Sequence, residues 1–250
     1  MDTHHLTIIT GASRGLGLAM LQQRLAEGHH VLAISRTPPH VAAAGVDRLQ
    51  IWQADLSDAA PVAARLHDWL VAVDPATLAS VSLINNAGAV SRLAPLARID
   101  SDELVTVMRV GLEAPLLLSA AFLRGTQGLT VPRRLLMISS GLGRRPMASG
   151  AAYGATKAGL DHLVRALAIE QAELPDGARV MSLAPGVVDT DMQAQLRAAD
   201  PKLFGEREHF VRLKEEGRLD SPAQAAAKVL RVLDSADFGV GDPVGDVRTR

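Results

Sequence analysis

The chain contains no cysteine, and this absence excludes disulfide bonds, thiolate metal sites and a cysteine nucleophile. It also fits a reducing compartment, so we expect a cytoplasmic protein. Aromatic residues make up 3% of the 250 residues, too few for stacking on nucleic-acid bases to be a main mode of binding. The formal net charge of −1 provides no general attraction to nucleic acids or to anionic membranes.

Long apolar runs and targeting segments are also missing. We find no uninterrupted run of about 18 apolar residues, so we expect no membrane span. The first apolar strand begins at Leu6, and we therefore expect no signal peptide. Hydrophobic residues at 48% and charged residues at 21% are typical of a globular protein. No repeat or linker divides the sequence, which predicts a single domain over residues 1–250.

Strand-like apolar runs alternate with helical patterns along most of the chain. The predicted strands are residues 6–10, 30–34, 49–53, 81–84, 135–138 and 179–183. Helices are expected at about 57–73, from Asp100 to about Leu123, and from near Tyr153 onward. Asp100 and Glu103 have the spacing of a capping box, and Pro115 is expected to bend the helix that they begin. The alternation predicts an α/β fold: a doubly wound parallel sheet with helices on both faces.

A glycine-rich turn follows the first predicted strand. Its sequence is Gly11-Ala12-Ser13-Arg14-Gly15-Leu16-Gly17, and leucines at helical spacing come after it. In a strand–turn–helix context, glycines let the backbone approach a pyrophosphate, and the helix N-terminus offers free N–H groups to phosphates. The sequence therefore predicts a dinucleotide-binding site. The alternative is an ordinary glycine turn.

Tyr153 and Lys157 stand four residues apart, which places them on one face of the predicted helix. Ser140 lies thirteen residues before Tyr153. A free tyrosine has a pKa of about 10 and is a poor base at neutral pH, but a fixed cation nearby favours the phenolate. The pair is therefore predicted to exchange a proton with a carbonyl or an alcohol. A chance pairing on one helix face is the alternative.

Six short motifs occur in one order along the chain. They are Thr10 to Gly17, Asp55-Leu56, Asn85 to Gly88, Ser140, Tyr153 with Lys157, and Pro185 to Thr190. Together they resemble the short-chain dehydrogenase/reductase family over nearly the whole chain. The stretches Glu113 to Pro115 and Pro185 to Met192 are also similar to bacterial sepiapterin and benzil reductases. The resemblance implies one Rossmann-type NAD(P)-binding domain, assembled as a homodimer or homotetramer, that acts on a small carbonyl or alcohol.

The resemblance also implies a role for each matching residue. Ser140 would bind the substrate oxygen, Tyr153 would donate a proton to it, and Lys157 would lower the pKa of Tyr153 and hold the nicotinamide ribose. The residues implied in cofactor binding are Gly11, Ser13, Arg14, Gly15, Leu16, Gly17, Arg36, Asp55, Leu56, Asn86, Ala87, Gly88, Tyr153, Lys157, Pro185, Gly186, Val188 and Thr190. No metal is expected.

Several of these residues also fit a purely local role. Asp55 fits a helix N-cap, residues 86–88 fit a turn that ends a strand, and Ser140 fits an ordinary loop serine. Ser139 is the second candidate for the catalytic serine, although the thirteen-residue interval favours Ser140.

The choice of cofactor depends on charge beyond the glycine motif. Folds that bind NAD usually place an acid about 20 residues after this motif. Residues 34–37 are Ile-Ser-Arg-Thr and offer no acid. A guanidinium at Arg36 suits the 2′-phosphate of NADP, and Arg14 is expected to make a second contact. The sequence therefore favours NADP(H); the alternative is that both arginines are merely exposed.

Gly111 departs from the family pattern, in which an asparagine stands here between Val and Leu. That asparagine helps to hold a water that relays protons to the catalytic lysine. Glycine cannot do so directly, although a water held by other polar groups would replace it. Close packing, slowed proton relay and a repurposed site all remain open as reasons for the glycine.

Two classes of function follow from these observations. The first is an NADPH-dependent reductase of a ketone, aldehyde or diketone. The second, which Gly111 keeps open, is an NADP-binding sensor or assembly protein with little catalysis. Dehydration or epimerisation would need a further acid or base, and we find none.

The segment 193–219 is helical in pattern, dense in charge and interrupted by Pro201 and Gly205. It is expected to form either a solvated helix pair or a mobile lid over the substrate. Substrate contacts are expected from this segment and from residues 91–95 and 142–149, with Leu142, Met147 and Met192 as apolar members.

Overall fold

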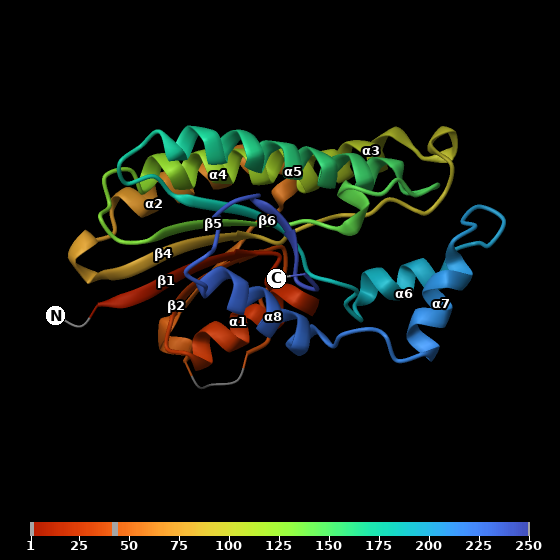
Figure 1. Cartoon of the computed structure of the whole chain (residues 1–250), viewed down its shortest axis with the longest axis horizontal. Helices are drawn as coiled ribbons and strands as arrows, with labels where there is room; N and C mark the ends of the chain where they lie inside the picture. Colours follow the sequence, from red (N-terminus) through yellow and green to blue (C-terminus); the bar gives the residue numbers. More distant parts are fainter. Residues whose placement is uncertain (1–2, 42–44, 250) are drawn as a thin grey trace.

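A parallel sheet lies between two layers of helices in the computed structural model, which describes residues 3–41 and 45–249 (Figure 1). The strands are β1 His4–Thr10, β2 His30–Ser35, β3 Leu49–Gln53, β4 Leu78–Asn85, β5 Arg133–Ile138, β6 Arg179–Ala184 and β7 Val244–Asp246. Their order in the sheet is β3-β2-β1-β4-β5-β6-β7, and each neighbouring pair is parallel. The predicted doubly wound α/β fold is confirmed.

Helices cover both faces of this sheet. The helices α1 Gly15–Ala26 and α8 Pro222–Asp234 pack together on one face. The other face carries α2 Ala59–Val71, α3 Ser101–Met108, α4 Ala114–Gly125 and α5 Ala151–Ala172. Two further helices, α6 Asp191–Ala198 and α7 Arg207–Glu215, project beyond the sheet (Figure 1). The central strands β1, β4 and β5 are buried along most of their length, because helices cover both faces of the sheet, and small polar residues such as Thr7 and Ser82 are buried among their apolar residues.

Two elements near the C-terminus were not predicted. Strand β7 has three residues and extends the sheet by pairing beside β6, which is too short a run to stand out in the sequence. Helix α8 begins with a capping box, in which Ser221 and Gln224 bond reciprocally, followed by Pro222 in the first turn. This is a recognised start signal for a helix, and it would have revealed α8.

The predicted capping box at Asp100 is wrong. Asp100 occupies the N-cap position, but its side chain makes no capping hydrogen bond. Its Oδ2 lies 2.9 Å from Nη2 of Arg92, and Glu103 Oε2 accepts a hydrogen bond from the Arg92 backbone at 2.9 Å. Both carboxylates are therefore engaged by Arg92, a partner that the local capping pattern does not include.

The long helix predicted after Asp100 is interrupted at the expected place. A π-helical turn, η5 Arg109–Glu113, joins α3 to α4, and Pro115 stands in the first turn of α4. Proline has no N–H to donate to the carbonyl four residues earlier, that of Gly111. The interruption predicted at Pro115 is therefore present as the π-helical turn η5.

Residues Ser101–Gly125 are together long and apolar enough to cross a membrane, with a mean hydropathy of 1.5 over an 18-residue window. In the fold they form two helices joined by η5, and α4 packs against α2. Leu118, Ala121 and Phe122 of α4 belong to the main apolar core. A core helix passes the same test of length and composition, so the segment is weak evidence for a membrane span.

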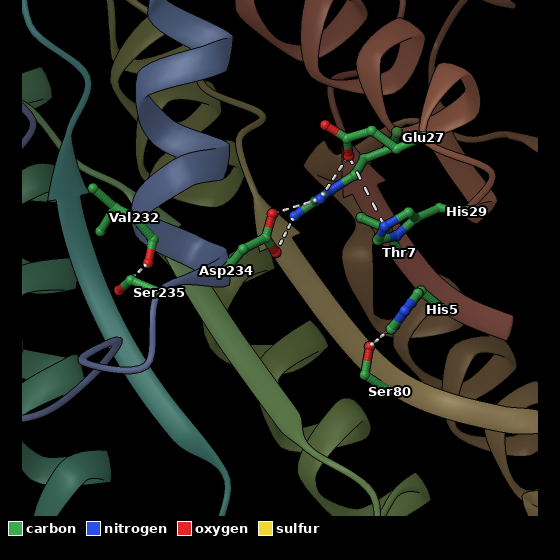
Figure 2. Close-up of polar contacts among 9 residues, drawn as sticks. His5, Thr7, Glu27, His29, Ser80, Val232, Asp234 and Ser235 are labelled. Carbon is green, nitrogen blue, oxygen red and sulfur yellow. Dashed lines mark hydrogen bonds and ion pairs between the residues drawn. The ribbon is translucent and has the colours of Figure 1, made fainter.

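A network of polar side chains lies at the amino ends of the strands (Figure 2). The predicted motifs follow the opposite, carboxyl ends of the strands. The buried Arg24 of α1 donates to both oxygens of Asp234 on α8 at 2.8 and 2.7 Å, and to Glu27 at 2.8 Å. Next to it, His29 Nδ1 lies 3.1 Å from Thr7 Oγ1, and the His29 ring stacks on that of His5.

Acid is expected to weaken the fold through His29. Burial, together with the charge of Arg24, lowers its pKa from 6.5 to about 4. Between these values the unfolded chain binds more protons than the folded chain, so stability increases with pH. We expect the free energy of unfolding to fall by about 1–3 kcal/mol between pH ~6.5 and pH ~4 through this residue. Urea unfolding at a series of pH values would measure it.

His29→Gln is expected to flatten this pH dependence, because the titrating group is removed. His40→Gln is the matched control, since His40 is exposed. A variant at His29 with the same slope as the wild type would contradict the assignment.

Candidate active site

The glycine turn is tightly packed where it follows the carboxyl end of β1. Gly11 and Gly15 have φ of +66° and +54°, a conformation that favours glycine. A Cβ on Gly17 would lie 2.2 Å from the carbonyl oxygen of Gly11, so only glycine fits there. The backbone is therefore bare at the N-terminus of α1, as a pyrophosphate site requires.

The predicted motif after β4 lies against this turn. Asn86 Nδ2 donates to the carbonyls of Thr10 at 3.0 Å and Gly11 at 3.2 Å. Thr10 Oγ1 accepts from the backbone N–H groups of Asn86 and Ala87, both at 3.0 Å. A Cβ on Gly88 would lie 3.9 Å from Lys157 Nζ, so this segment joins the glycine turn to the predicted catalytic residues.

The structure brings Ser140, Tyr153 and Lys157 together. Ser140 follows β5 and caps a short 3₁₀ turn, η6 Gly141–Gly143, by accepting a hydrogen bond from the Leu142 backbone at 3.2 Å, and its hydroxyl interacts with the Tyr153 phenol. Tyr153 and Lys157 are both buried on α5. Lys157 Nζ donates to the Ile138 carbonyl at 2.8 Å. The Ser139 hydroxyl, in contrast, has no hydrogen-bond partner within the described residues.

The pKa of Tyr153 differs from the sequence-based expectation. Burial raises it to about 12, and the hydrogen bond from Ser140 only partly opposes this shift. Lys157 was expected to lower the pKa, but its ammonium is directed to the Ile138 carbonyl and lies 5.4 Å from the centre of the Tyr153 ring. Tyr153 therefore carries its proton at neutral pH, and in this structure its phenol is a weaker acid than that of a free tyrosine.

Lys157 is buried as well, and burial lowers its pKa to about 8. The negative charge of Asp161, one helical turn further along α5, acts in the opposite direction. The lysine therefore titrates close to neutral pH.

The remaining predicted cofactor residues lie around the glycine turn. Asp55 accepts a hydrogen bond from the Ser57 backbone at 2.9 Å and caps the 3₁₀ turn η2 Leu56–Asp58, as its local alternative proposed. The hydrogen bond from the Ser57 backbone lowers the pKa of Asp55, and the charge of Arg36, which is exposed after β2, adds a smaller effect in the same direction. Arg14, the second arginine expected to contact the cofactor, is paired with a carboxylate: its Nη1 donates to Asp191 Oδ2 at the start of α6, at 3.0 Å.

The segment from Pro185 to Thr190 reaches the glycine turn at its end, where Thr190 lies next to Gly15. A Cβ on Gly15 would lie 3.3 Å from the Thr190 methyl group, and Val188 forms a β-bridge with Asp220. Gly186 has a φ of +80°, which places the turn that redirects the chain after β6. Ser13 and Leu16 lie in the glycine turn itself and at the start of α1.

Two of the three segments expected to contact substrate, residues 142–149 and 193–219, are joined to each other. Ser149, a non-glycine residue with φ of +65°, donates to the Leu203 carbonyl at 2.6 Å. Arg145 forms a two-point ion pair with Glu206 at 3.2 and 3.1 Å. An apolar cluster joins the same segments, and its buried members are Met147, Leu196, Phe204, Phe210 and Leu213. Leu142 packs against this substrate-side cluster.

Sequence reasoning missed Phe204 and Phe210 in the substrate-side cluster. Both are buried, and their rings stack with centroids 5.7 Å apart. The available signal was two aromatic residues within an otherwise charged segment of a chain that has few aromatics.

Gly111 lies buried in η5 against α5. A Cβ at this position would be 2.9 Å from Thr156 Cγ2 and 3.0 Å from Thr156 Cβ and Oγ1. Of the reasons considered for the glycine, close packing is therefore present in the structure. The methyl group of Thr156 fills the space into which a side chain at position 111 would project.

Comparison with known proteins agrees with this arrangement. Residues 5–201 match the short chain dehydrogenase family. The benzil reductase ((S)-benzoin forming) of Bacillus cereus is 33% identical over 95% of this chain and 97% of its own length. The enzyme of the same description from Bacillus subtilis is 35% identical, over 92% of this chain and 93% of its own.

A solved structure gives the same result at the level of the fold. The short-chain dehydrogenase/reductase from Burkholderia vietnamiensis is 34% identical, with a TM-score of 0.67 over 99% of both chains. The family match spans the glycine turn, the Ser140 segment and the Tyr153–Lys157 pair. The chain therefore belongs to the short-chain dehydrogenase/reductase family of oxidoreductases, enzymes that use nicotinamide cofactors.

Proposed function

We propose that the protein is an NADPH-dependent reductase of a ketone, aldehyde or diketone, with Tyr153 as the proton donor. The observation that carries this proposal is the meeting of Ser140, Tyr153 and Lys157 beside the glycine turn. Family membership and the two benzil reductases among its relatives support carbonyl reduction.

The roles of the side chains follow from their chemistry. The bound cofactor supplies a hydride. Ser140 and Tyr153 present two hydroxyl donors to the substrate oxygen, where negative charge develops as the carbonyl is reduced. Tyr153, which is protonated at neutral pH, then delivers its proton to that oxygen. In this proposal Lys157 favours the phenolate that remains once its ammonium turns from the Ile138 carbonyl to Tyr153, since both side chains lie on one helix face.

The residues around the glycine turn fit a dinucleotide. Gly11, Gly15 and Gly17 leave the start of α1 open to phosphates. Arg36 is exposed at the end of β2 and free to turn to a 2′-phosphate, and residues 34–37 carry no acid that would repel it. Arg14 can leave Asp191 for a second contact at little cost, because an exposed ion pair is worth less than about 1 kcal/mol.

NADPH is expected to bind at least tenfold more tightly than NADH. Tenfold corresponds to about 1.4 kcal/mol, which a single charge-assisted phosphate contact can supply. Titration of both cofactors with wild type and Arg36→Ala would measure it, and Arg98→Ala is a control on an arginine outside this region. Equal affinities, or an undiminished preference in Arg36→Ala, would contradict the NADP assignment.

We further propose an apolar substrate, with a bulky diketone such as benzil as the first candidate. The substrate-side cluster offers Met147, Phe204 and Phe210 next to the loop that follows Ser140. The relatives from Bacillus are named for benzil. NADPH oxidation with benzil, small diketones, aldehydes and sugars would rank the substrates; a clear preference for polar sugars would reject an apolar site.

A sensor or assembly protein with little catalysis is the second candidate, and Gly111 is the observation that favours it. A wild-type protein that binds NADPH but reduces no member of a broad carbonyl panel would support it.

We also infer a cytoplasmic homodimer or homotetramer. Apolar side chains exposed along the long helices, among them Met108, Leu116 and Ile169, support association through these helices. Light scattering of the purified protein would measure the assembly.

A further inference from the structure

Asp161 is a buried carboxylate to which the proposed mechanism gives no role. It lies one turn after Lys157 on α5 and is 2% exposed. Its Oδ1 accepts a hydrogen bond from the Ser182 hydroxyl of β6 at 2.5 Å. Its Oδ2 is buried and has no hydrogen-bond partner within the described ranges 3–41 and 45–249. A buried charge of this kind is costly unless an opposite charge compensates it.

The carboxylate is confined next to the loop that carries Ser140. A Cβ on Gly143 would lie 2.9 Å from Asp161 Oδ2 and 3.0 Å from the Lys157 carbonyl oxygen. Glycine at position 143 thus allows η6 to pack directly on this turn of α5. Asp161 is enclosed by β6, by η6 and by its own helix, and Ser182 fixes one of its oxygens.

Lys157 is the buried cation on the same helix face. An acid four residues after a lysine is the less favourable order for stabilising a helix, so helix stability alone does not account for the pair. Burial lowers the pKa of Lys157 to about 8, and the charge of Asp161 counteracts this shift. Without that charge, a lysine buried to this extent would lose its proton at lower pH.

No other charge opposes the burial of Lys157 in the described part of the chain. Tyr153 lies one turn before it, and its phenol is neutral at neutral pH. The elements around α5 carry further charged side chains: Asp102, Glu103, Arg109, Glu113, Arg133, Arg134, Arg144, Arg179 and Asp246. Asp102, Arg109, Glu113 and Arg179 are exposed, and Glu103 pairs with Arg92. Arg133 and Arg134 begin β5, at the opposite end from Ile138, and Asp246 pairs with Arg144 and Arg248.

We propose that Asp161 is a positioning residue that acts through Lys157, keeping the lysine protonated beside Tyr153 by its buried negative charge. The inference rests on the proposed function, since it concerns the charge of a residue to which that function gives a catalytic role. Asp161 itself touches neither substrate nor cofactor in this assignment.

Nuclear magnetic resonance of the full chain tests the inference without any turnover. The chain has four lysines, at 157, 202, 214 and 228, and of these only Lys157 is buried. In protein with ¹³C-labelled lysine, the Lys157 signal is expected to titrate near pH 8. In Asp161→Asn we expect its midpoint about one pH unit lower, a tenfold loss of proton affinity. An unchanged midpoint in the folded variant would overturn the proposal.

Two controls separate charge from packing. Ser182→Ala removes the hydrogen bond to Asp161 but keeps its charge, and should move the Lys157 midpoint much less than Asp161→Asn. Asp246→Asn removes a carboxylate from β7 and should not move it. An equal shift in Ser182→Ala would reject a charge effect.

The wild-type protein provides a second measurement if Asp161→Asn does not fold. The carboxyl ¹³C signal of Asp161 should show a step at the midpoint of Lys157, because the two charges interact. The absence of this step would also overturn the proposal.

In active enzyme, the high-pH limb of carbonyl reduction should move to lower pH in Asp161→Asn, in parallel with the lysine midpoint. A limb that stays in place while the midpoint moves would show that the charge of Lys157 does not control the reaction, and would refute the positioning role. If the wild type reduces no carbonyl, the proposed function fails, whereas the lysine titration still decides whether Asp161 sets the charge of Lys157.

Discussion

Tyr153→Phe is expected to lower the rate of carbonyl reduction by at least about a hundredfold, because general acid catalysis typically contributes about 10²–10⁴-fold. The ring remains and fills the same buried space, so NADPH affinity and the melting temperature should change little. The proton that reaches the substrate oxygen is lost. Steady-state rates with the best carbonyl of the panel, together with cofactor titration, measure both quantities.

Tyr153 is the single tyrosine of the chain, which makes the assignment directly observable. The ultraviolet absorbance of tyrosinate should appear in the wild type only as the pH approaches about 12, in agreement with the raised pKa. Ser140→Ala should also slow the reaction, whereas Ser139→Ala is the matched control, because the Ser139 hydroxyl contacts no described polar group. A Tyr153→Phe enzyme that keeps a tenth or more of the wild-type rate would exclude this residue as the acid.

Gly111→Asn is expected to destabilise the protein by about 1–3 kcal/mol, the usual cost of overfilling a packed core. The new Cβ would lie 2.9 Å from the methyl group of Thr156, which is completely buried. For a domain of this size, each 1 kcal/mol lowers the melting temperature by about 2–4 °C. Thermal unfolding therefore measures the effect.

The rate should not increase in the same variant. Thr156 Oγ1 donates to the Tyr153 carbonyl at 2.8 Å, so a displaced Thr156 disturbs the turn that carries the proposed proton donor. Gly205→Ala is the control, since a Cβ there meets no atom within 4 Å. Adding Thr156→Ala to Gly111→Asn should restore part of the lost stability, because it removes two of the three crowding atoms. A Gly111→Asn enzyme that is faster than an inactive wild type would favour a site retired from catalysis.

The proximity of the candidate catalytic residues was predictable because their spacing reports local geometry. Tyr153 and Lys157 share a helix face through a four-residue interval, and the glycine turn is defined by its neighbouring strand and helix. The strands of the sheet interior were predictable for a similar reason: they are buried on both faces and appear as apolar runs. The short β7 has no such run, since it contributes three residues at the edge.

Contacts between side chains that are distant in the sequence could not be predicted from sequence patterns. The capping box at Asp100 failed because Arg92, in a separate loop, attracts both carboxylates. The pKa of Tyr153 was expected to fall because the spacing places a cation nearby, but spacing says nothing about burial or about the Ile138 carbonyl that holds the ammonium. The crowding at Gly111 depends on Thr156, which stands 45 residues later in the sequence.

The joined substrate-side segments have a consequence for attempts to change what the enzyme accepts. Ser149 is bonded to Leu203, Arg145 is paired with Glu206, and Met147 packs in the same cluster as Phe204. A loop transplanted from a relative would arrive without its partners and leave Glu206 and the Leu203 carbonyl unmatched. To change substrate specificity in this fold, residues 142–149 and 196–213 should therefore be exchanged together rather than one side chain at a time. We expect the two segments to vary together among relatives for the same reason.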